Sequence, residues 1–533
     1  MATSSAVGAD GPARLINRLI RAVHDAPETA AGLVAVIRTE PGTFLPLALA
    51  MARYGAGPVD TALAAAVNDI HLTLEESSKL EEMLPLSTGV LPHTALAVAV
   101  QRRQRANSDV HLAVALRRLG ARLASVGRYR EALAAVEEAV ELYRQLVTAD
   151  PEAHTRNLAG ALSNLGARLA SVGRYREALA ASEKSVELYR QLVTADPEAL
   201  AAALSNLGSR MGEVGQRREA LVVSEEAVEL YRQLVTADPE AHTPSLARSL
   251  HNLGIRLDDV GRPREALAVA VEAVELCRQL VTADPEAYTP SLAWSLQILG
   301  AQLSEVGQRG EAVAAAEEAV ELCRQLVTAD PEAYTPSLAR SLQSFGAQLG
   351  EVGQRGEAVA VAEEAVELCR QLVTANAEAH TPALAWSLQS FGIQLGHAGQ
   401  RGEAVAVAEE AVELCRQLVT ANAEAYTPAL ARSLQSFGAQ LGHAGQRGEA
   451  VAVAEEAVEL CRQLATADPE AHTRTLAEAL LSLGFRLGDV GQRGEAVAVA
   501  EEAVHLFARL YADLPEVYVD ELAASRQLRD LLM

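Results

Sequence analysis

Apolar residues recur along most of this chain at helical spacing and also with a longer, fixed period. A string of the form LxxLGxxLxxVG returns with variations, and its closing glycine falls at Gly127, Gly173, Gly215, Gly261, Gly307, Gly353, Gly399, Gly445 and Gly491. Successive closing glycines are 46 residues apart, except for one interval of 42. A fixed period of this size is typical of repeat architectures, so we expect one helical unit stacked many times.

Each unit predicts a first helix, helix A, that buries one face. In the unit that closes at Gly353, four apolar residues follow one another at spacings of four, three and four: Leu338, Leu342, Phe345 and Leu349. We expect Thr335 to cap the start of this helix, with Pro336 in its first turn. Gly353 then supplies the left-handed residue that ends the helix.

A second helix, helix B, is predicted to begin at about Arg355. Its apolar stripe consists of Ala358, Val361, Ala362, Ala365, Leu368 and Leu372. The pair Glu363 and Glu364 falls largely opposite, where a solvated helix face explains it better than a paired acid and base. Gly346 predicts a close crossing of helices A and B, and the pair Asp330 and Pro331 discourages further helix.

A single hairpin of this kind would leave much of its apolar surface in water, so neighbouring hairpins must stack to bury it. The predicted fold is therefore all-α: a right-handed α-solenoid of about nine stacked antiparallel hairpins, mostly of 46 residues. The one short interval comes from a deletion of four residues near Leu200, and we expect the local geometry to differ there.

The two ends of the chain do not show the repeat clearly. We expect residues 1–12 to be disordered. Residues 13–109 read as short helices separated by proline, glycine and polar breaks, which indicates either a degenerate cap or a small separate adaptor domain. The repeat array is predicted over residues 110–509, and residues 510–533 read as a C-terminal capping helix.

Composition and charge narrow the possible partners. Apolar residues make up 49% of the sequence but aromatic residues only 4%, which suits closely packed helices. The net charge is −24 and no run of Lys or Arg offers a clustered positive surface, which argues against nucleic acid. No apolar stretch is long enough for a membrane span, and the beginning lacks a secretory pattern, so we expect a soluble cytoplasmic protein. Arginine greatly outnumbers lysine, a bias typical of GC-rich bacterial genomes.

No residue pattern predicts catalysis, a cofactor or a metal site. The five cysteines share one repeat position with aromatic residues, which indicates packing: Cys277, Cys323, Cys369, Cys415 and Cys461. Neighbouring B helices should lie too far apart for disulfides. Histidines of the linkers alternate with tyrosine and indicate half-exposed side chains. His397 and His443 are equivalent residues of adjacent units, and nothing near them completes a ligand set.

The unit resembles the tetratricopeptide repeat in the order of its small and apolar residues. In one unit these are Leu342, Phe345, Gly346, Leu349, Gly353, Ala358 and Ala365. The period exceeds the 34 residues usual for that family, and in this the units are similar to those of kinesin light chain and of bacterial arrays of the same style. The resemblance implies a non-catalytic scaffold or regulator that binds a protein or peptide.

The resemblance also implies a concave groove lined by helix A, with contacts from fixed positions of that helix. The second position carries Arg248, Trp294, Arg340, Trp386 and Arg432. The fifth position carries His251, Gln297, Gln343, Gln389 and Gln435. The sixth position of earlier units carries Asn164, Asn206 and Asn252, similar to an asparagine with which family members hold peptides. The lysines of the family's carboxylate clamp are missing, which counts against recognition of a C-terminal carboxylate.

Tryptophan and arginine are enriched among interface hot spots. The row of residues at the second position of helix A therefore predicts binding of a segment with acidic and aromatic residues. An alternative is that each tryptophan only covers the next helix A. Two other functions stay open. The chain could be a self-assembling structural protein, because units from 285 to 468 are nearly identical and could pack between chains. It could also be the sensor of a bacterial signalling or defence system whose effector acts in trans.

Overall fold

The computed structural model describes residues 11–52, 58–84, 91–192 and 196–533. Over these ranges the chain forms 25 α-helices and one short 3-10 turn, with no strand. The chain divides into two compact units. The first contains residues 1–168 and 325–335, and the second contains residues 169–324 and 336–533.

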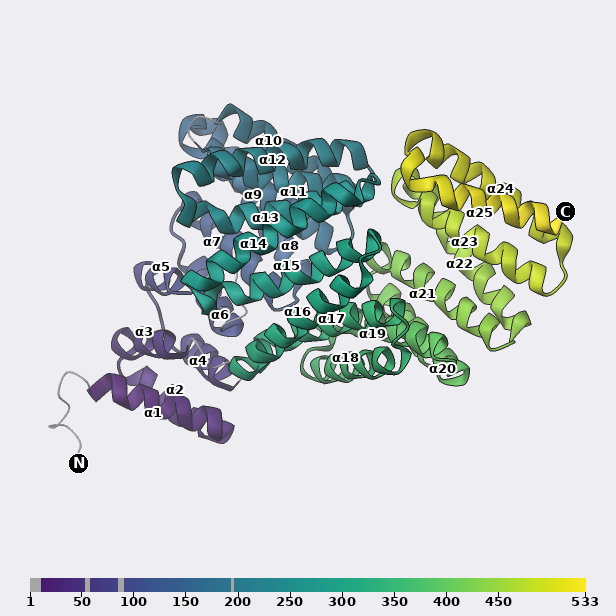
Figure 1. The fold of residues 1–533 in the computed structure, drawn as a ribbon. Helices are drawn as coiled ribbons and strands as arrows, with labels where there is room; N and C mark the ends of the chain where they lie inside the picture. The colour runs from purple at the N-terminus through teal and green to yellow at the C-terminus, as the bar shows by residue number, and fades with distance from the viewer. Residues whose placement is uncertain (1–10, 53–57, 85–90, 193–195) are drawn as a thin grey trace. The chain divides into compact units, whose positions relative to one another are not determined.

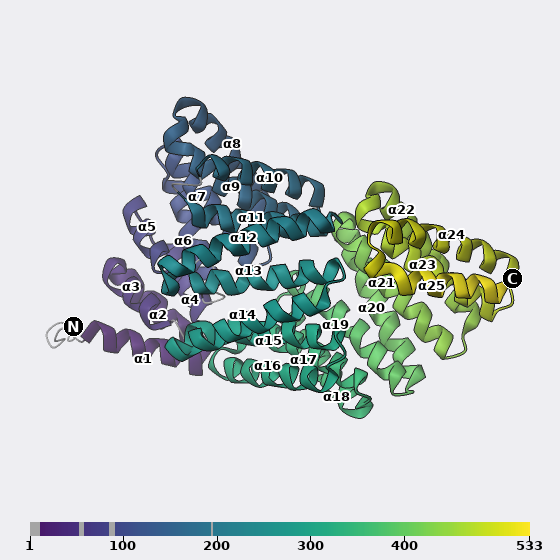
Figure 2. The same cartoon turned by 45° about the horizontal axis from the view of Figure 1, so that its top comes forward.

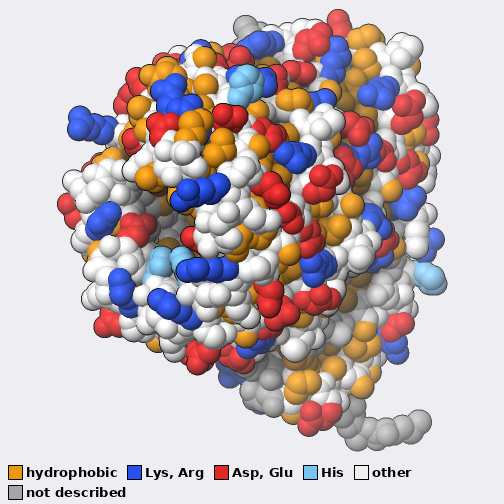
Figure 3. Space-filling model, turned by 90° about the vertical axis from the view of Figure 1, so that its right-hand side faces the viewer, with side chains coloured by type: hydrophobic (Ala, Val, Ile, Leu, Met, Phe, Trp, Pro, Cys, Tyr) orange, Lys and Arg blue, Asp and Glu red, His pale blue; other side chains and the backbone are white. Residues whose placement is uncertain are grey.

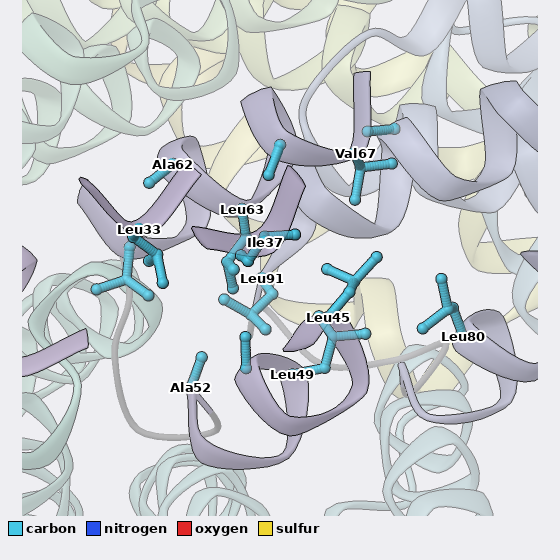
Figure 4. Close-up of a cluster of buried hydrophobic side chains, with 14 of the residues drawn as sticks. Leu33, Ile37, Leu45, Leu49, Ala52, Ala62, Leu63, Val67, Leu80 and Leu91 are labelled. Atoms are coloured by element: carbon cyan, nitrogen blue, oxygen red, sulfur yellow. The ribbon is translucent and has the colours of Figure 1, made fainter. Parts of the chain in front are cut away.

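The first unit begins with helices that pack around a core of their own. They are α1 (Gly11–Asp25), η1 (Pro27–Thr29), α2 (Ala30–Thr39), α3 (Pro41–Met51), α4 (Pro58–Asp69), α5 (Leu74–Glu82) and α6 (Pro92–Arg105). Side chains such as Leu33, Leu63 and Leu91 point toward one another between these helices (Figure 4). Helix α1 starts at Gly11, two residues before the predicted boundary. Residues 1–10 lie outside the described residues, and the choice between cap and adaptor domain stays open.

The repeats follow as alternating A and B helices. The A helices are α7 (Asp109–Ser125), α9 (Pro151–Ser171), α11 (Pro197–Glu213), α13 (Pro239–Asp259), α15 (Pro285–Glu305), α17 (Pro331–Glu351), α19 (Ala377–His397), α21 (Ala423–His443) and α23 (Pro469–Asp489). The B helices are α8 (Tyr129–Ala149), α10 (Tyr175–Gln191), α12 (Arg217–Ala237), α14 (Pro263–Ala283), α16 (Arg309–Ala329), α18 (Arg355–Ala375), α20 (Arg401–Ala421), α22 (Arg447–Ala467) and α24 (Arg493–Asp513). The last helix is α25 (Pro515–Leu532). In Figures 1 and 2, α12 to α15 lie side by side in sequence order, which confirms the predicted solenoid of stacked hairpins.

The closing glycines are the turns between helices A and B. All nine have a positive φ, between 77° and 89°, a region that costs little only for glycine. The predicted close crossing is also present, because a Cβ on Gly346 would lie 3.4 Å from the carbonyl oxygen of Ala358. The hairpin thus depends on glycine for its turn, whereas a methyl group at Gly346 would make an ordinary van der Waals contact at the crossing.

The start of helix A differs from the prediction. Helix α17 begins at Pro331, five residues before Pro336, which lies inside the helix. The cap is Asp330, whose Oδ1 accepts a hydrogen bond of 3.0 Å from the backbone N–H of Ala333. Thr335 instead donates to the carbonyl oxygen of Pro331. The pair Asp330 and Pro331 therefore starts a helix directly after another ends, because aspartate caps well and proline suits the first position.

The buried face of helix B is shifted from the predicted stripe. In α18 the fully buried side chains are Ala358, Ala362, Ala365, Val366 and Cys369. Leu368 is only half-buried, at the edge of that face. The predicted change at the short interval is also present: α10 and α11 have 17 residues each, where most other helices of the repeats have 21.

The outer side of the B helices carries a regular series of ion pairs in the second unit. An arginine near the end of one B helix pairs with a glutamate of the next B helix, as Arg324 does with Glu364 at 2.9 Å, and this glutamate is the second of a Glu-Glu pair except at Glu272, which follows Val271. The series comprises Arg190–Glu226, Arg232–Glu272, Arg278–Glu318, Arg324–Glu364, Arg370–Glu410, Arg416–Glu456 and Arg462–Glu502. We expected Glu364 to lie on a solvated helix face, and the structure shows that it also forms an ion pair with the preceding unit. Figure 3 shows acidic and basic side chains interspersed over the face that it presents.

Replacing Leu342 by Ala should lower the free energy of unfolding by about 2 to 5 kcal/mol, because its side chain is fully buried between hairpins. The matched variant Leu368→Ala should cost clearly less, since that side chain is only half-buried. Urea unfolding followed by circular dichroism measures both. An equal loss in the two variants would show that the buried face is assigned wrongly.

Candidate functional site

The second position of helix A forms a row of exposed side chains in the second unit. Its members, Arg248, Trp294, Arg340, Trp386 and Arg432, are all exposed. Trp294 keeps 39% of its surface and Trp386 keeps 51%. Among the described residues, no acidic side chain lies within ion-pair distance of the three arginines. The row therefore combines unneutralised positive charge with open aromatic surface.

The tryptophans also touch neighbouring units. The guanidinium of Arg432 stacks over the Trp386 ring, 5.0 Å from its centroid. The Trp294 ring lies 5.4 Å from that of His251, centroid to centroid. Each tryptophan thus covers part of an adjacent helix A and still exposes a large surface, and binding of a partner by this row stays a prediction.

A groove of about 750 Å³ runs between α17 and α19. Arg340 and Gln343 line it from α17, and Trp386, Gln389 and Ile393 line it from α19. The linker side chain His380, expected to be half-exposed, forms part of its wall. The groove thus offers one guanidinium, an aromatic face, two amides and aliphatic surface within one space.

The residues at the fifth position of helix A are buried or half-buried, and most of them bond to the next helix A. His251 and Gln297 are buried, with 3% and 8% of their surface exposed. Gln297 donates to the hydroxyl of Ser341 in the next helix A at 2.6 Å, and Gln343 likewise bonds to Ser387. Gln389 and Gln435 are half-buried and bond to the carbonyl of Arg432 and to the sulfur of Cys461, respectively.

Serines complete these contacts, and sequence reasoning missed them. Ser341 also lies 3.2 Å from the sulfur of Cys323, and equivalent contacts join Cys277 to Ser295, Cys369 to Ser387 and Cys415 to Ser433. The recurrence of serine one residue after the Arg/Trp position was the available signal. Because these polar groups lie in a buried interface, satisfying each other's hydrogen bonds fixes the register of neighbouring hairpins.

The sixth position varies along the chain. Asn206 is exposed on α11, whereas Asn164 on α9 and Asn252 on α13 are half-buried. Asn252 donates to the hydroxyl of Ser205 at 3.1 Å. Its amide is therefore already engaged with the preceding helix A, and Asn206 is the most accessible of the three.

The cysteines have the packing environment that the sequence predicts. All five are buried free thiols. Burial raises the pKa of each thiol above its ordinary value, to about 11 for Cys461, which disfavours the reactive thiolate. Over the part of the chain that the structure describes, no group of three or more His, Cys, Asp or Glu side chains could hold a metal ion.

His251 should make stability depend on pH. Burial lowers its pKa from 6.5 to about 4, so the folded chain holds it neutral. Its contribution to stability is complete above pH 6.5 and is lost as the pH falls toward 4, by about 2 kcal/mol at pH 5. The variant His251→Gln introduces the residue of four other units and should reduce the loss of stability between pH 7 and 5, measured by urea unfolding. The exposed control His397→Gln should leave it unchanged; equal behaviour of the two variants would contradict this assignment.

Models of known families match several stretches of the array. A tetratricopeptide repeat model matches residues 157–233, and another matches residues 112–151 and 246–285. Residues 286–330 match the model of anaphase-promoting complex subunit 5. No curated protein matches the chain significantly. In the described ranges, no helix combines the length and the apolar character needed to cross a membrane.

Solved structures give distant likenesses. A Rap protein complexed with competence and sporulation factor is 13% identical and covers 76% of this chain and 99% of its own, with a TM-score of 0.48. BtubC from P. vanneervenii is 18% identical, over 46% and 92% of the two chains, with a TM-score of 0.38. A putative kinesin light chain with TPR-like repeats from Podosopora anserina is 24% identical, over 42% and 97%, with a TM-score of 0.33. Likenesses this distant say nothing about what this chain binds. Tetratricopeptide repeat models thus match residues 112–151, 157–233 and 246–285, and the same hairpin of long period returns from α7 to α24.

Proposed function

We propose that this protein is a non-catalytic cytoplasmic scaffold or regulator that binds an extended segment of another protein along the row from Arg248 to Arg432. The observation that carries the proposal is the contrast between two sets of arginines. Those of the B helices given above are ion-paired, whereas the three of the row are exposed without acidic partners among the described residues, and Arg340 lines the groove. Arrays of these repeats use such extended surfaces to bind proteins.

The chemistry of the row favours a segment with acidic and aromatic residues. A guanidinium presents several donors in a plane and pairs with a carboxylate through two hydrogen bonds. An aromatic side chain of the partner could stack on the exposed face of Trp386, and Arg432 already shows that a cation is held over that ring. The side-chain NH2 groups of Gln343 and Gln389 already donate within the array, so their carbonyl oxygens at the groove are the groups suited to accept from the partner's backbone N–H.

The two tryptophans allow a direct binding assay. They are the only tryptophans of the chain and both lie on the row, so their fluorescence should change when a peptide of alternating Asp and Phe residues binds. Arg340→Gln should weaken that binding about tenfold, because it removes a charged hydrogen-bond donor. Arg324→Gln, which removes an ion-paired arginine of a B helix, is the matched control and should bind as the wild type does.

Equal binding by both variants would contradict the proposal. A peptide in which Lys replaces Asp should also leave the fluorescence unchanged, since it would meet the same charge. Binding of the two peptides with one affinity would mean that the arginines of the row do not select the partner.

Self-association is the second function to test, because the units from 285 to 468 are nearly identical in sequence. Light scattering at micromolar concentration distinguishes the two. A monomeric mass would remove self-assembly as the function, and a mass that rises with concentration would favour it.

A further inference from the structure

Within the second unit, three turns of the array lie against linkers about 250 residues further along the chain. A Cβ added to Gly173 would lie 2.7 Å from the backbone of Ala425, and one on Gly215 would collide with the carbonyl group of Glu470. A Cβ on Gly261 would lie 3.1 Å from the side chain of Val517. These three turns therefore sit on three successive linkers, between B and A helices, in one regular register.

Polar contacts join the same segments. The side-chain amide of Asn422 donates to the carbonyl oxygen of Val172 at 3.1 Å. The Nε of Arg176 donates to Asp468 Oδ2 at 3.0 Å. Arg218 bonds to the carbonyl oxygen of Asp513. In two consecutive units, then, the turn rests on one linker and the arginine after it reaches the next linker.

The sequence changes where these contacts end. Three residues after the turn glycine, the first four units carry arginine: Arg130, Arg176, Arg218 and Arg264. The last five units carry glycine at the same place: Gly310, Gly356, Gly402, Gly448 and Gly494. A Cβ added at any of these five glycines would meet no atom within 4 Å. Arginine at this position thus accompanies the three turns with a neighbour, at Gly173, Gly215 and Gly261, and glycine accompanies five turns without one.

The linker residues that meet these turns also supply polar partners. Asn422 stands where Asp238 and Asp284 stand in earlier units, and each of the three caps a helix A. Only the amide can also donate to the carbonyl of Val172. Asp468 is half-buried under Arg176, whereas Asp284 is exposed. Burial tends to raise the pKa of Asp468, but the bonds from Arg176 and from the N–H of Ala471 lower it below the ordinary value.

We propose that these contacts form a built-in clasp, in which the turns at Gly173, Gly215 and Gly261 lock onto the linkers 422–425, 468–471 and 514–517 and hold the second unit folded back on itself. The clasp joins the helices from α10 to α14, which include those of Asn206 and Arg248, to the helices from α21 to α25, of which α21 carries Arg432. It therefore sets how far apart the two ends of the arginine and tryptophan row lie. Because Arg176 is 65% exposed, its ion pair with Asp468 is weakened by salt, and the clasp can open without unfolding a hairpin.

Small-angle X-ray scattering of the full chain tests the clasp. The triple variant Arg176→Gln, Arg218→Gln and Asn422→Asp removes its polar contacts and keeps the cap at residue 422. Its radius of gyration should rise above that of the wild type, with unchanged helicity by circular dichroism. The matched control Arg309→Gln, Arg355→Gln and Asp284→Asn changes the same residue types at turns without a neighbour and at an exposed cap, and should keep the wild-type radius.

A crosslink provides the second measurement. In the variant Arg176→Cys with Asp468→Cys, a short bismaleimide should join the two positions within one chain, since the five native thiols are buried. The crosslinked fraction should fall when Arg218→Gln and Asn422→Asp, which remove the remaining polar contacts of the clasp, are added. Absence of the crosslink at low salt, or a triple variant with the wild-type radius and helicity, would overturn the proposal.

Discussion

Burial of alanine-rich faces between neighbouring hairpins is the interaction on which the rest of this structure depends. In α18, Ala358, Ala362 and Ala365 are almost completely buried, and Gly346 of α17 approaches the same helix without a side chain. Small residues let the helices come close, so each hairpin presents a flat face that only another hairpin can cover. The stability of each hairpin thus depends on its contacts with neighbouring hairpins as much as on its internal contacts. Buried groups such as Gln297, Ser341 and Cys323 then fix how those interfaces align.

The same stacking separates two surfaces with different electrostatics. On the outer side of the B helices, arginine and glutamate from successive units meet at about the same place in every unit, so most positive charge there is neutralised locally. On the A helices, Arg248, Arg340 and Arg432 have no such partners and alternate with tryptophan. A chain with a net charge of −24 thereby presents a row of exposed positive groups, one of which, Arg340, lines a groove. That contrast, and not the total charge, is what an acidic partner would recognise.

Much of this fold could be predicted from the sequence because its signals repeat. Gly353 and its eight equivalents identify the turns, and the spacing of Leu342 and Leu349 identifies the buried face of helix A. The start of helix A was predicted five residues late, because Thr335 and Pro336 look like a cap and a first turn, while Asp330 and Pro331 perform those roles. The burial of His251 and Gln297 could not be foreseen, since it depends on Ser295 and Ser341 of the following helix. Contacts between Arg176 and Asp468 depend on how the hairpins curve, which no local pattern specifies.

The central claim is that the row from Arg248 to Arg432 is where this protein meets its partner. Proximity crosslinking with mass spectrometry in native lysate tests it most directly. The wild type is compared with the double variant Trp294→Ala and Trp386→Ala, and with Val222→Ala, which alters an exposed residue of helix B. The account predicts that specific crosslinked partners disappear in the double variant, at unchanged helicity, and persist in the control. Partners retained in full by the double variant would contradict it and would move the binding surface away from the groove.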